Sequence, residues 1–223
     1  MKKKRIAFVL GSMKRGGAER VISILSNHYA SKGWVVDIIL LLSGECDYEL
    51  DQKIRIISLA GTGSRLRQLP DWIFGIRKYL KEYRPDTILS FAARINIITA
   101  VAAFGIRTNL VVSERNDPEM DGRSFIVRLA TNLIYPRTSR VVFQTKKAQA
   151  CFNDRVIENS SVIYNPINVS HKASNQSSNK IVAVGRLEPQ KNHELLVTAF
   201  KSVHTLFPQY KLYIYGEGTL RNH

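Results

Sequence analysis

An arginine and a lysine stand five positions apart in the string GRLEPQKN, residues 185–192. The apolar run before it, residues 181–184, predicts a buried strand, and apolar residues at three- and four-residue steps from 195 to 207 predict a helix after it. Open α/β sheets bind ligands at the carboxyl ends of their strands, and helix N-termini favour anions. Arg186 and Lys191 are therefore candidate ligands of a diphosphate, since both form strong charge-assisted bonds to phosphate. For this spacing alone, a solvated loop with incidental charges is the alternative.

A second candidate loop has the string GSMKRGGAER, residues 11–20, between an expected strand and an expected helix. Gly16 and Gly17 would let the backbone bend and present free N–H groups at the helix start, next to Lys14 and Arg15. Such an arrangement is typical of an anion cradle. The string matches neither the dinucleotide-binding fingerprint nor the P-loop. Glycines that serve only a tight turn are the alternative.

A third group of polar residues, SERNDP at 113–118, directly follows an expected strand at 110–112. Charged groups are unfavourable in a protein core, and the carboxyl end of a strand is where open sheets bind ligands. An ordinary solvated loop is the alternative here. Further along, Asn165 precedes a proline in the string YNPIN, where it could also serve as a turn residue.

Taken together, these strings resemble the family 4 (group 1) glycosyltransferases of the GT-B fold, of the type that assembles bacterial surface polysaccharides and glycans. The resemblance rests on GRLEPQKN with LYIYGEG at 212–218, on GGAER and on SERNDP, and it covers nearly the whole chain. It implies that the donor diphosphate is bound by Arg186, Lys191, Gly16 and Gly17. It also implies a loop on the nucleotide side that consists of Gly216, Glu217 and Gly218.

Many relatives carry a histidine near residues 113–118 that is aimed at the donor sugar, and this chain has Glu114 or Arg115 there. The histidine's role does not transfer, so Glu114 and Arg115 are only candidate catalytic residues, and Arg115 could equally bind an acceptor phosphate. The resemblance places four more candidates on the acceptor or phosphate side: Lys14, Arg15, Asn116 and Asn165.

The activity that the resemblance implies is transfer of a sugar, with retention of configuration, from a nucleotide-sugar, most simply a UDP-sugar. The acceptor would be a glycan or a sugar on a polyprenyl diphosphate at the cytoplasmic membrane face, and neither a metal nor a cofactor is expected. The family's E-x7-E motif, which follows the Gly-Glu-Gly loop and binds ribose and sugar, is not in these 223 residues. We therefore expect an incomplete second domain and an inactive chain.

The expected fold is α/β, a Rossmann-like doubly wound parallel sheet, because strand and helix patterns alternate along the chain. Residues 1–167 form the expected N-terminal, acceptor-side domain. Residues 168–179 are polar and lack periodicity, which predicts a linker. Residues 180–223 would begin a second Rossmann-like domain that binds the nucleotide-sugar.

The composition indicates a basic protein, with 33 Lys and Arg against 18 Asp and Glu and a net charge of +15. Such a charge attracts anionic partners. Residues 2–5 are all basic, and residues 122–153 contain six basic residues and no acidic one, so we expect peripheral binding to anionic lipid on the cytoplasmic face. A nucleic-acid binder is one alternative, but it lacks interleaved aromatics and a recognised module. A non-catalytic remnant that binds acceptor or lipid is the other. The two cysteines form no zinc or disulfide pattern.

Overall fold

The computed structural model describes residues 3–165 and 178–221 and divides the chain into two units, Met1–Pro166 and Ile167–His223. Most of the expected linker, residues 168–177, lies outside the described residues. The expected domain boundaries therefore stay a prediction.

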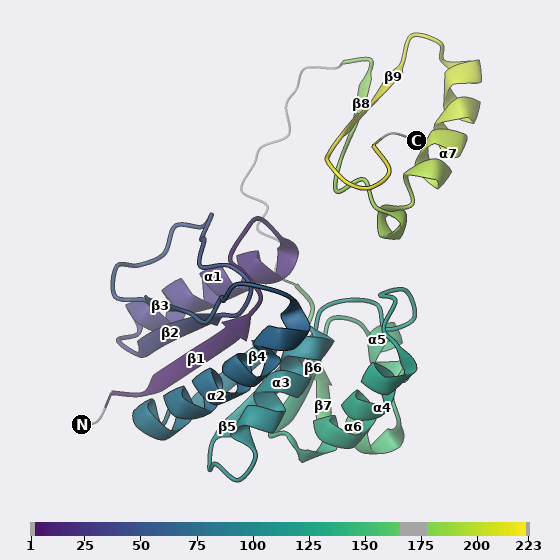
Figure 1. Cartoon of the computed structure of the whole chain (residues 1–223). Coiled ribbons are helices and arrows are strands. Elements are labelled where there is room, and N and C mark those ends of the chain that lie inside the picture. Colours follow the sequence, from purple (N-terminus) through teal and green to yellow (C-terminus); the bar gives the residue numbers. More distant parts are fainter. Residues whose placement is uncertain (1–2, 166–177, 222–223) are drawn as a thin grey trace. The chain divides into compact units, whose positions relative to one another are not determined.

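Unit 1 contains a seven-stranded parallel sheet in the order β3-β2-β1-β4-β5-β6-β7 (Figure 1). The chain adds β2 and β3 on one side of β1 and then β4 to β7 on the other side. The point where this order reverses lies between β1 and β4, which is where open sheets bind ligands. The strands are β1 (Arg5–Leu10), β2 (Val35–Leu40), β3 (Arg55–Ser58), β4 (Thr87–Phe91), β5 (Asn109–Glu114), β6 (Arg140–Phe143) and β7 (Ser160–Val162).

Helices cover both faces of this sheet, with α2 and α3 on one face and α1 on the other (Figure 1). In β1, Ala7 and Val9 belong to the core beneath α2 and α3, whereas Phe8 and Leu10 belong to the core beneath α1. This division follows from the alternation of side chains along a strand. The predicted doubly wound fold is confirmed. The helices are α1 (Gly17–Ser31), α2 (Arg65–Tyr83), α3 (Ala93–Ala103), α4 (Phe125–Ile134), η1 (Tyr135–Arg137), α5 (Lys146–Ala150) and α6 (Asp154–Glu158).

The short helix α6 is absent from the elements that the sequence predicts. Asn153 caps it, because its side chain accepts a hydrogen bond from the backbone N–H of Val156 at 3.1 Å. Five residues are too few to display a 3.6-residue apolar period, and only Val156 is buried. The sequence signal for this helix is its capping residue, because asparagine is favoured at the N-cap position.

Unit 2 is a parallel strand–helix–strand arrangement with β8 (Lys180–Val184), η2 (Pro189–Lys191), α7 (His193–Leu206) and β9 (Lys211–Tyr215). The expectation of a buried strand at 181–184 is wrong, since Val182 and Val184 are exposed. Within residues 178–221 the only strand beside β8 is β9, and α7 is the only α-helix available to cover them. This leaves apolar side chains of β8 in solvent.

Candidate functional site

In unit 2 the loop after β8 and the loop after β9 are joined through their backbones. The N–H of Gly185 donates to the carbonyl of Tyr215 at 3.0 Å, and the N–H of Leu187 donates to the carbonyl of Glu217 at 2.9 Å. The strands run parallel and in register, so their carboxyl ends meet at one edge. The structure therefore brings the predicted Gly-Arg loop and the predicted Gly-Glu-Gly loop together.

Gly216 and Gly218 are needed for this close approach. A Cβ atom on Gly216 would overlap the carbonyl oxygen of Gly185, and one on Gly218 would overlap the carbonyl oxygen of Leu187. Backbone atoms cannot move aside as a side chain can, so only glycine fits at either position. The side chain of Glu217 forms an ion pair with Arg221.

The two predicted cations lie on this joined loop. Arg186 directly follows Gly185, and its carbonyl oxygen lies 3.0 Å from the ring nitrogen Nε2 of His193. Lys191 ends the short helix η2, and its Cγ and Cδ atoms lie 4.0 Å from the place where a side chain on Gly185 would begin. Both cationic side chains are exposed. Among the described residues, no carboxylate forms an ion pair with either of them.

The loop between β1 and α1 differs from the expected cradle in one respect. The N–H of Gly16 is not free: it donates to the hydroxyl oxygen of Tyr48 at 3.0 Å, and that hydroxyl donates to the carbonyl of Gly16 at 2.8 Å. Tyr48 lies after β2, which pairs directly with β1. Gly17 begins α1 in open space, where a Cβ atom would meet nothing within 4 Å.

The basic residues of the same loop have acidic partners on the segment after β2. The ammonium of Lys14 pairs with Glu45 at 2.6 Å, and this hydrogen bond raises the pKa of Lys14. The backbone N–H of Arg15 donates to Asp47 at 3.1 Å, while the Arg15 side chain is exposed. Sequence reasoning missed Glu45 and Asp47. Because β2 pairs with β1 in parallel, the loops that follow these two strands lie side by side.

Arg115 lies at the carboxyl end of β5 and has only neutral neighbours at bonding distance. Its Nη2 donates to the side-chain oxygen of Asn165 at 2.5 Å, and its guanidinium lies 5.2 Å from the centre of the Phe91 ring. With the Gln144 amide oxygen turned toward it, Nε also donates to Gln144 at 2.9 Å. Burial lowers the pKa of Arg115, with a smaller opposing effect from the charge of Glu19. The structure thus joins two predicted residues, Arg115 and Asn165, that lie fifty positions apart.

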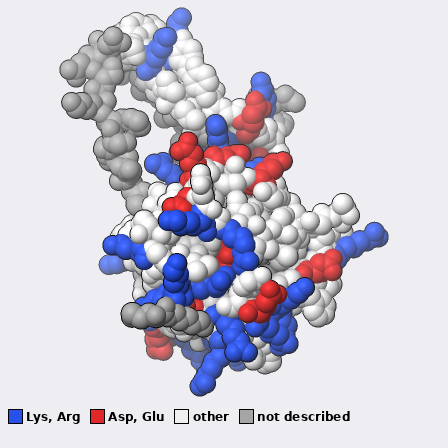
Figure 2. Space-filling view, turned by 90° about the vertical axis from the view of Figure 1, so that its left-hand side faces the viewer, with Lys and Arg blue, Asp and Glu red and all other residues white. Residues whose placement is uncertain are grey.

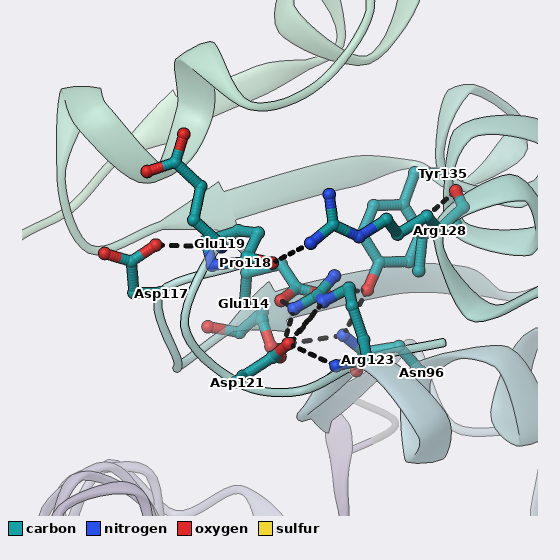
Figure 3. A network of polar contacts seen from close by, with 11 residues as sticks. Asn96, Glu114, Asp117, Pro118, Glu119, Asp121, Arg123, Arg128 and Tyr135 are labelled. Atoms are coloured by element: carbon teal, nitrogen blue, oxygen red, sulfur yellow. Dashed lines mark hydrogen bonds and ion pairs between the residues drawn. The ribbon is translucent and has the colours of Figure 1, made fainter. Parts of the chain in front are cut away.

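Glu114 points the other way, into the protein, where it is only 1% exposed (Figure 3). One carboxylate oxygen accepts from Arg123 at 2.6 Å and the other from the hydroxyl of Tyr135. That hydroxyl also accepts from Asn96 at 3.0 Å, and Arg123 pairs with Asp121 at 2.6 Å. The catalytic role expected for Glu114 stays a prediction, and this geometry favours a role in holding the loop that follows β5.

The remaining residues of that loop are more open. Asn116 is exposed. Asp117 and Glu119, with Cys151, are the group of potential metal ligands found among the described residues. The ammonium of Lys147 lies 3.6 Å from Asp117 and 3.3 Å from Glu119, so a single protein cation already pairs with both carboxylates. This arrangement does not favour a metal centre.

The sequence of the chain matches two profiles of known protein families. Glycosyltransferase Family 4 matches residues 15–171, which is most of the chain, and Glycosyl transferases group 1 matches residues 166–223. The chain belongs to glycosyltransferase family 4. The resemblance drawn from the three motifs is thereby confirmed.

Two curated family members illustrate the similarity. A Campylobacter jejuni protein named GalNAc-alpha-(1->4)-GalNAc-alpha-(1->3)-diNAcBac-PP-undecaprenol alpha-1,4-N-acetyl-D-galactosaminyltransferase is 28% identical over 97% of this chain. The amylovoran biosynthesis glycosyltransferase AmsD of Erwinia amylovora is 27% identical over 96% of the chain. The chain spans 62% of the length of each of these relatives.

Solved structures of glycosyltransferases share the fold. The Anabaena protein Alr3699/HepE, crystallised with UDP and glucose, matches 96% of this chain and 61% of its own, with a TM-score of 0.73 and 21% identity. Sucrose-phosphate synthase from Thermosynechococcus elongatus also reaches 0.73, at 18% identity, over 96% of this chain and 62% of its own. Among the described residues of our chain, no helix is long and apolar enough to cross a membrane.

Proposed function

We propose that the protein containing this chain transfers a sugar, with retention of configuration, from a UDP-sugar to a glycan or to a sugar carried on a polyprenyl diphosphate. The observation that supports it most is the loop with Arg186 and Lys191, two exposed cations on a backbone braced by Gly216 and Gly218. The named relatives act in polysaccharide assembly or on undecaprenyl-diphosphate-linked sugars, which agrees with this acceptor class.

In this proposal Arg186 and Lys191 bind the donor diphosphate and stabilise the charge that develops on it as the sugar leaves. Preorganised cations at a leaving group can take the role that a divalent metal has in other enzymes. Neither side chain is neutralised by a carboxylate among the described residues, so both are available to a phosphate. We therefore propose a transfer that needs no metal and no further cofactor.

On the acceptor side we propose Arg115 as the residue that binds a phosphate or a sugar hydroxyl group. It follows β5, one strand away from the reversal of strand order, at the carboxyl edge where open sheets bind ligands. Asn165 and Gln144 orient the guanidinium without cancelling its charge. A partly desolvated arginine with neutral partners is a strong anion ligand, because arginine keeps its charge when buried.

We also propose that unit 1 binds the cytoplasmic membrane surface peripherally, which would bring it to a lipid-linked acceptor. Basic residues attract anionic lipid with about 1 kcal/mol each. On the side that Figure 2 shows, Lys and Arg side chains gather with Asp and Glu among them, so this side is not uniformly positive. Vesicle co-sedimentation with and without anionic lipid, and its weakening as the salt concentration rises, tests the attraction.

The donor site is tested by calorimetric titration of the chain with UDP. We expect Arg186→Ala and Lys191→Ala each to weaken binding by roughly tenfold or more, the loss of one charge-assisted bond of about 1.5–3 kcal/mol. Lys201→Ala, an exposed lysine on α7, is the matched control and should bind like the wild type. Absence of UDP binding, or equal binding by all variants, contradicts the donor site. Filter binding to RNA that competes with UDP would favour the nucleic-acid alternative.

A further inference from the structure

Helix α4 is apolar on the side that faces away from the core. Its inward side carries Thr131, which is buried, and it packs against α3. On its outward side Phe125 and Ile126 are each 76% exposed, and Leu129 and Leu133 are 49% and 53% exposed. At about 100° per residue these four positions fall within an arc of roughly 100°, opposite the buried side. A surface helix of a globular protein normally carries polar residues there.

Exposed apolar side chains also lie near the two ends of α4. Met120, in the loop that precedes α4, is exposed. A groove at the other end of the helix is lined by Val101 and Phe104 of the α3 end and by Ile134 of α4, and Val101 and Phe104 are exposed as well. Exposed apolar residues that lie singly need no explanation, but four large apolar side chains on one side of a helix mark an interaction surface.

Basic residues border the face, and the acidic residues just before α4, Glu119 and Asp121, are paired with Lys147 and Arg123. Arg128 and Arg137, on α4 and directly after it, are both exposed, and residues 122–153 contain no acidic residue. Arg128 also donates to the carbonyl of Pro118 at 3.3 Å, which ties α4 to the loop after β5 (Figure 3). The acidic residue that borders the C-terminal end of the helix, Asp154, shares that surface with Arg137 and Arg155.

We propose that the outward face of α4, made of Phe125, Ile126, Leu129 and Leu133, inserts into the interfacial layer of an anionic bilayer. Arg128 and Arg137 then lie at the level of the lipid phosphates, because long basic side chains place their charge in the headgroup layer while their stems stay apolar. A bilayer fits better than a second copy of the chain, since two such faces would bring like charges together. The proposal rests on the proposed membrane-linked acceptor and identifies the element that makes the contact.

The geometry links this contact to the candidate site. The loop of residues 115–124 runs directly from Arg115 at the end of β5 to the first turn of α4. Insertion of Phe125 and Ile126 therefore holds that loop at the headgroup layer. A phosphate that is joined to a membrane-embedded lipid tail lies at the same depth.

The experiment is flotation of the chain with vesicles of phosphatidylglycerol and phosphatidylcholine. Phe125→Ser and Ile126→Ser should each lower the bound fraction by roughly tenfold, as expected when a large apolar side chain no longer leaves water. Phe74→Ser is the matched control: Phe74 is also a largely exposed phenylalanine, but it lies on α2, and its variant should bind like the wild type. Because all three side chains are exposed, thermal melts should show intact folding.

A second readout separates insertion from simple charge attraction. In Phe125→Trp, vesicles with brominated acyl chains should quench the fluorescence, and the wild type should remain partly bound at 1 M salt. Absence of quenching, complete release by salt, or equal flotation of Phe125→Ser and Phe74→Ser overturns the proposal. Self-association that Phe125→Ser abolishes, without vesicle binding, overturns it in favour of a second copy. UDP titration tests the donor site independently of vesicle binding. Failure of the proposed donor site is therefore distinguished from failure of the proposed membrane face.

Discussion

The guanidinium of Arg115 donates to the side-chain oxygen of Asn165 at 2.5 Å, although fifty residues separate them in the chain. This bond joins the end of β5 to the segment after β7, so it spans three neighbouring strands of the sheet. It fixes a cation that has no carboxylate partner among the described residues at the carboxyl edge of unit 1.

If Arg115 binds the acceptor, Arg115→Lys should lower kcat/KM by roughly ten- to a hundredfold in the protein that contains this chain. Lysine keeps the charge but loses the planar fork that Asn165 and Gln144 orient. The effect should appear as a higher KM for the acceptor, with UDP affinity unchanged. Arg107→Lys, an exposed residue before β5, serves as control. Equal kinetics for both variants would show that Arg115 is only structural.

Arg186→Ala should lower kcat/KM of that protein by roughly ten- to a hundredfold or more, because the leaving diphosphate loses one charge-assisted bond of about 1.5–3 kcal/mol. Steady-state kinetics with a UDP-sugar measure it. Rates that match the wild type would mean that the loop contributes only to the fold.

Gly216→Ala should disrupt unit 2, because its new Cβ atom would overlap the carbonyl oxygen of Gly185. Forced overlap of this kind costs about 1–3 kcal/mol or more. Gly185→Ala is a control in the same pair of loops, since the nearest atoms to its Cβ lie at 4.0 Å. Hydrogen exchange of β8 and β9 should accelerate in the first variant and not in the second. Equal protection in the two variants would contradict the close approach.

Glu114→Ala should destabilise unit 1 by about 3 kcal/mol, because it removes a buried carboxylate and leaves Arg123 and Tyr135 short of a partner. For a domain of this size that corresponds to a melting temperature lower by roughly 6–12 °C. Glu82→Ala, an exposed glutamate on α2, should melt like the wild type. A small shift for Glu114→Ala together with lost activity would instead support a catalytic carboxylate.

Stability should fall at alkaline pH, because burial raises the pKa values of Tyr79 and Tyr135 above the ordinary tyrosine value of about 10. In the unfolded chain both phenols lose their protons first, so their contribution is complete below pH about 10 and is lost as the pH rises further. Thermal melts between pH 8 and 11 measure the decline. Tyr135→Phe should flatten it, and an unchanged slope would mean that other groups cause it.

Much of this protein can be read from local sequence. The spacing of apolar residues predicted the alternating strands and helices, and hence the doubly wound sheet. This works because the spacing within a short segment indicates which face of the segment is buried. GRLEPQKN placed Arg186 after a strand and Lys191 just before a helix, and the structure has them there, since the loop is built by neighbours in the chain. The two glycines of the Gly-Glu-Gly string likewise mark backbone that passes close to other backbone.

The tertiary structure alone decided the contacts between segments that are distant in the chain. The strand order of the sheet makes these segments neighbours. Tyr48 occupies the N–H of Gly16 because β2 lies beside β1, and Asn165 meets Arg115 across the sheet edge. Glu114 and Arg115 are adjacent in sequence, yet one is buried in an ion pair and the other lies at the site. Successive residues of a strand point to opposite sides, and which side is interior depends on the helices that cover it.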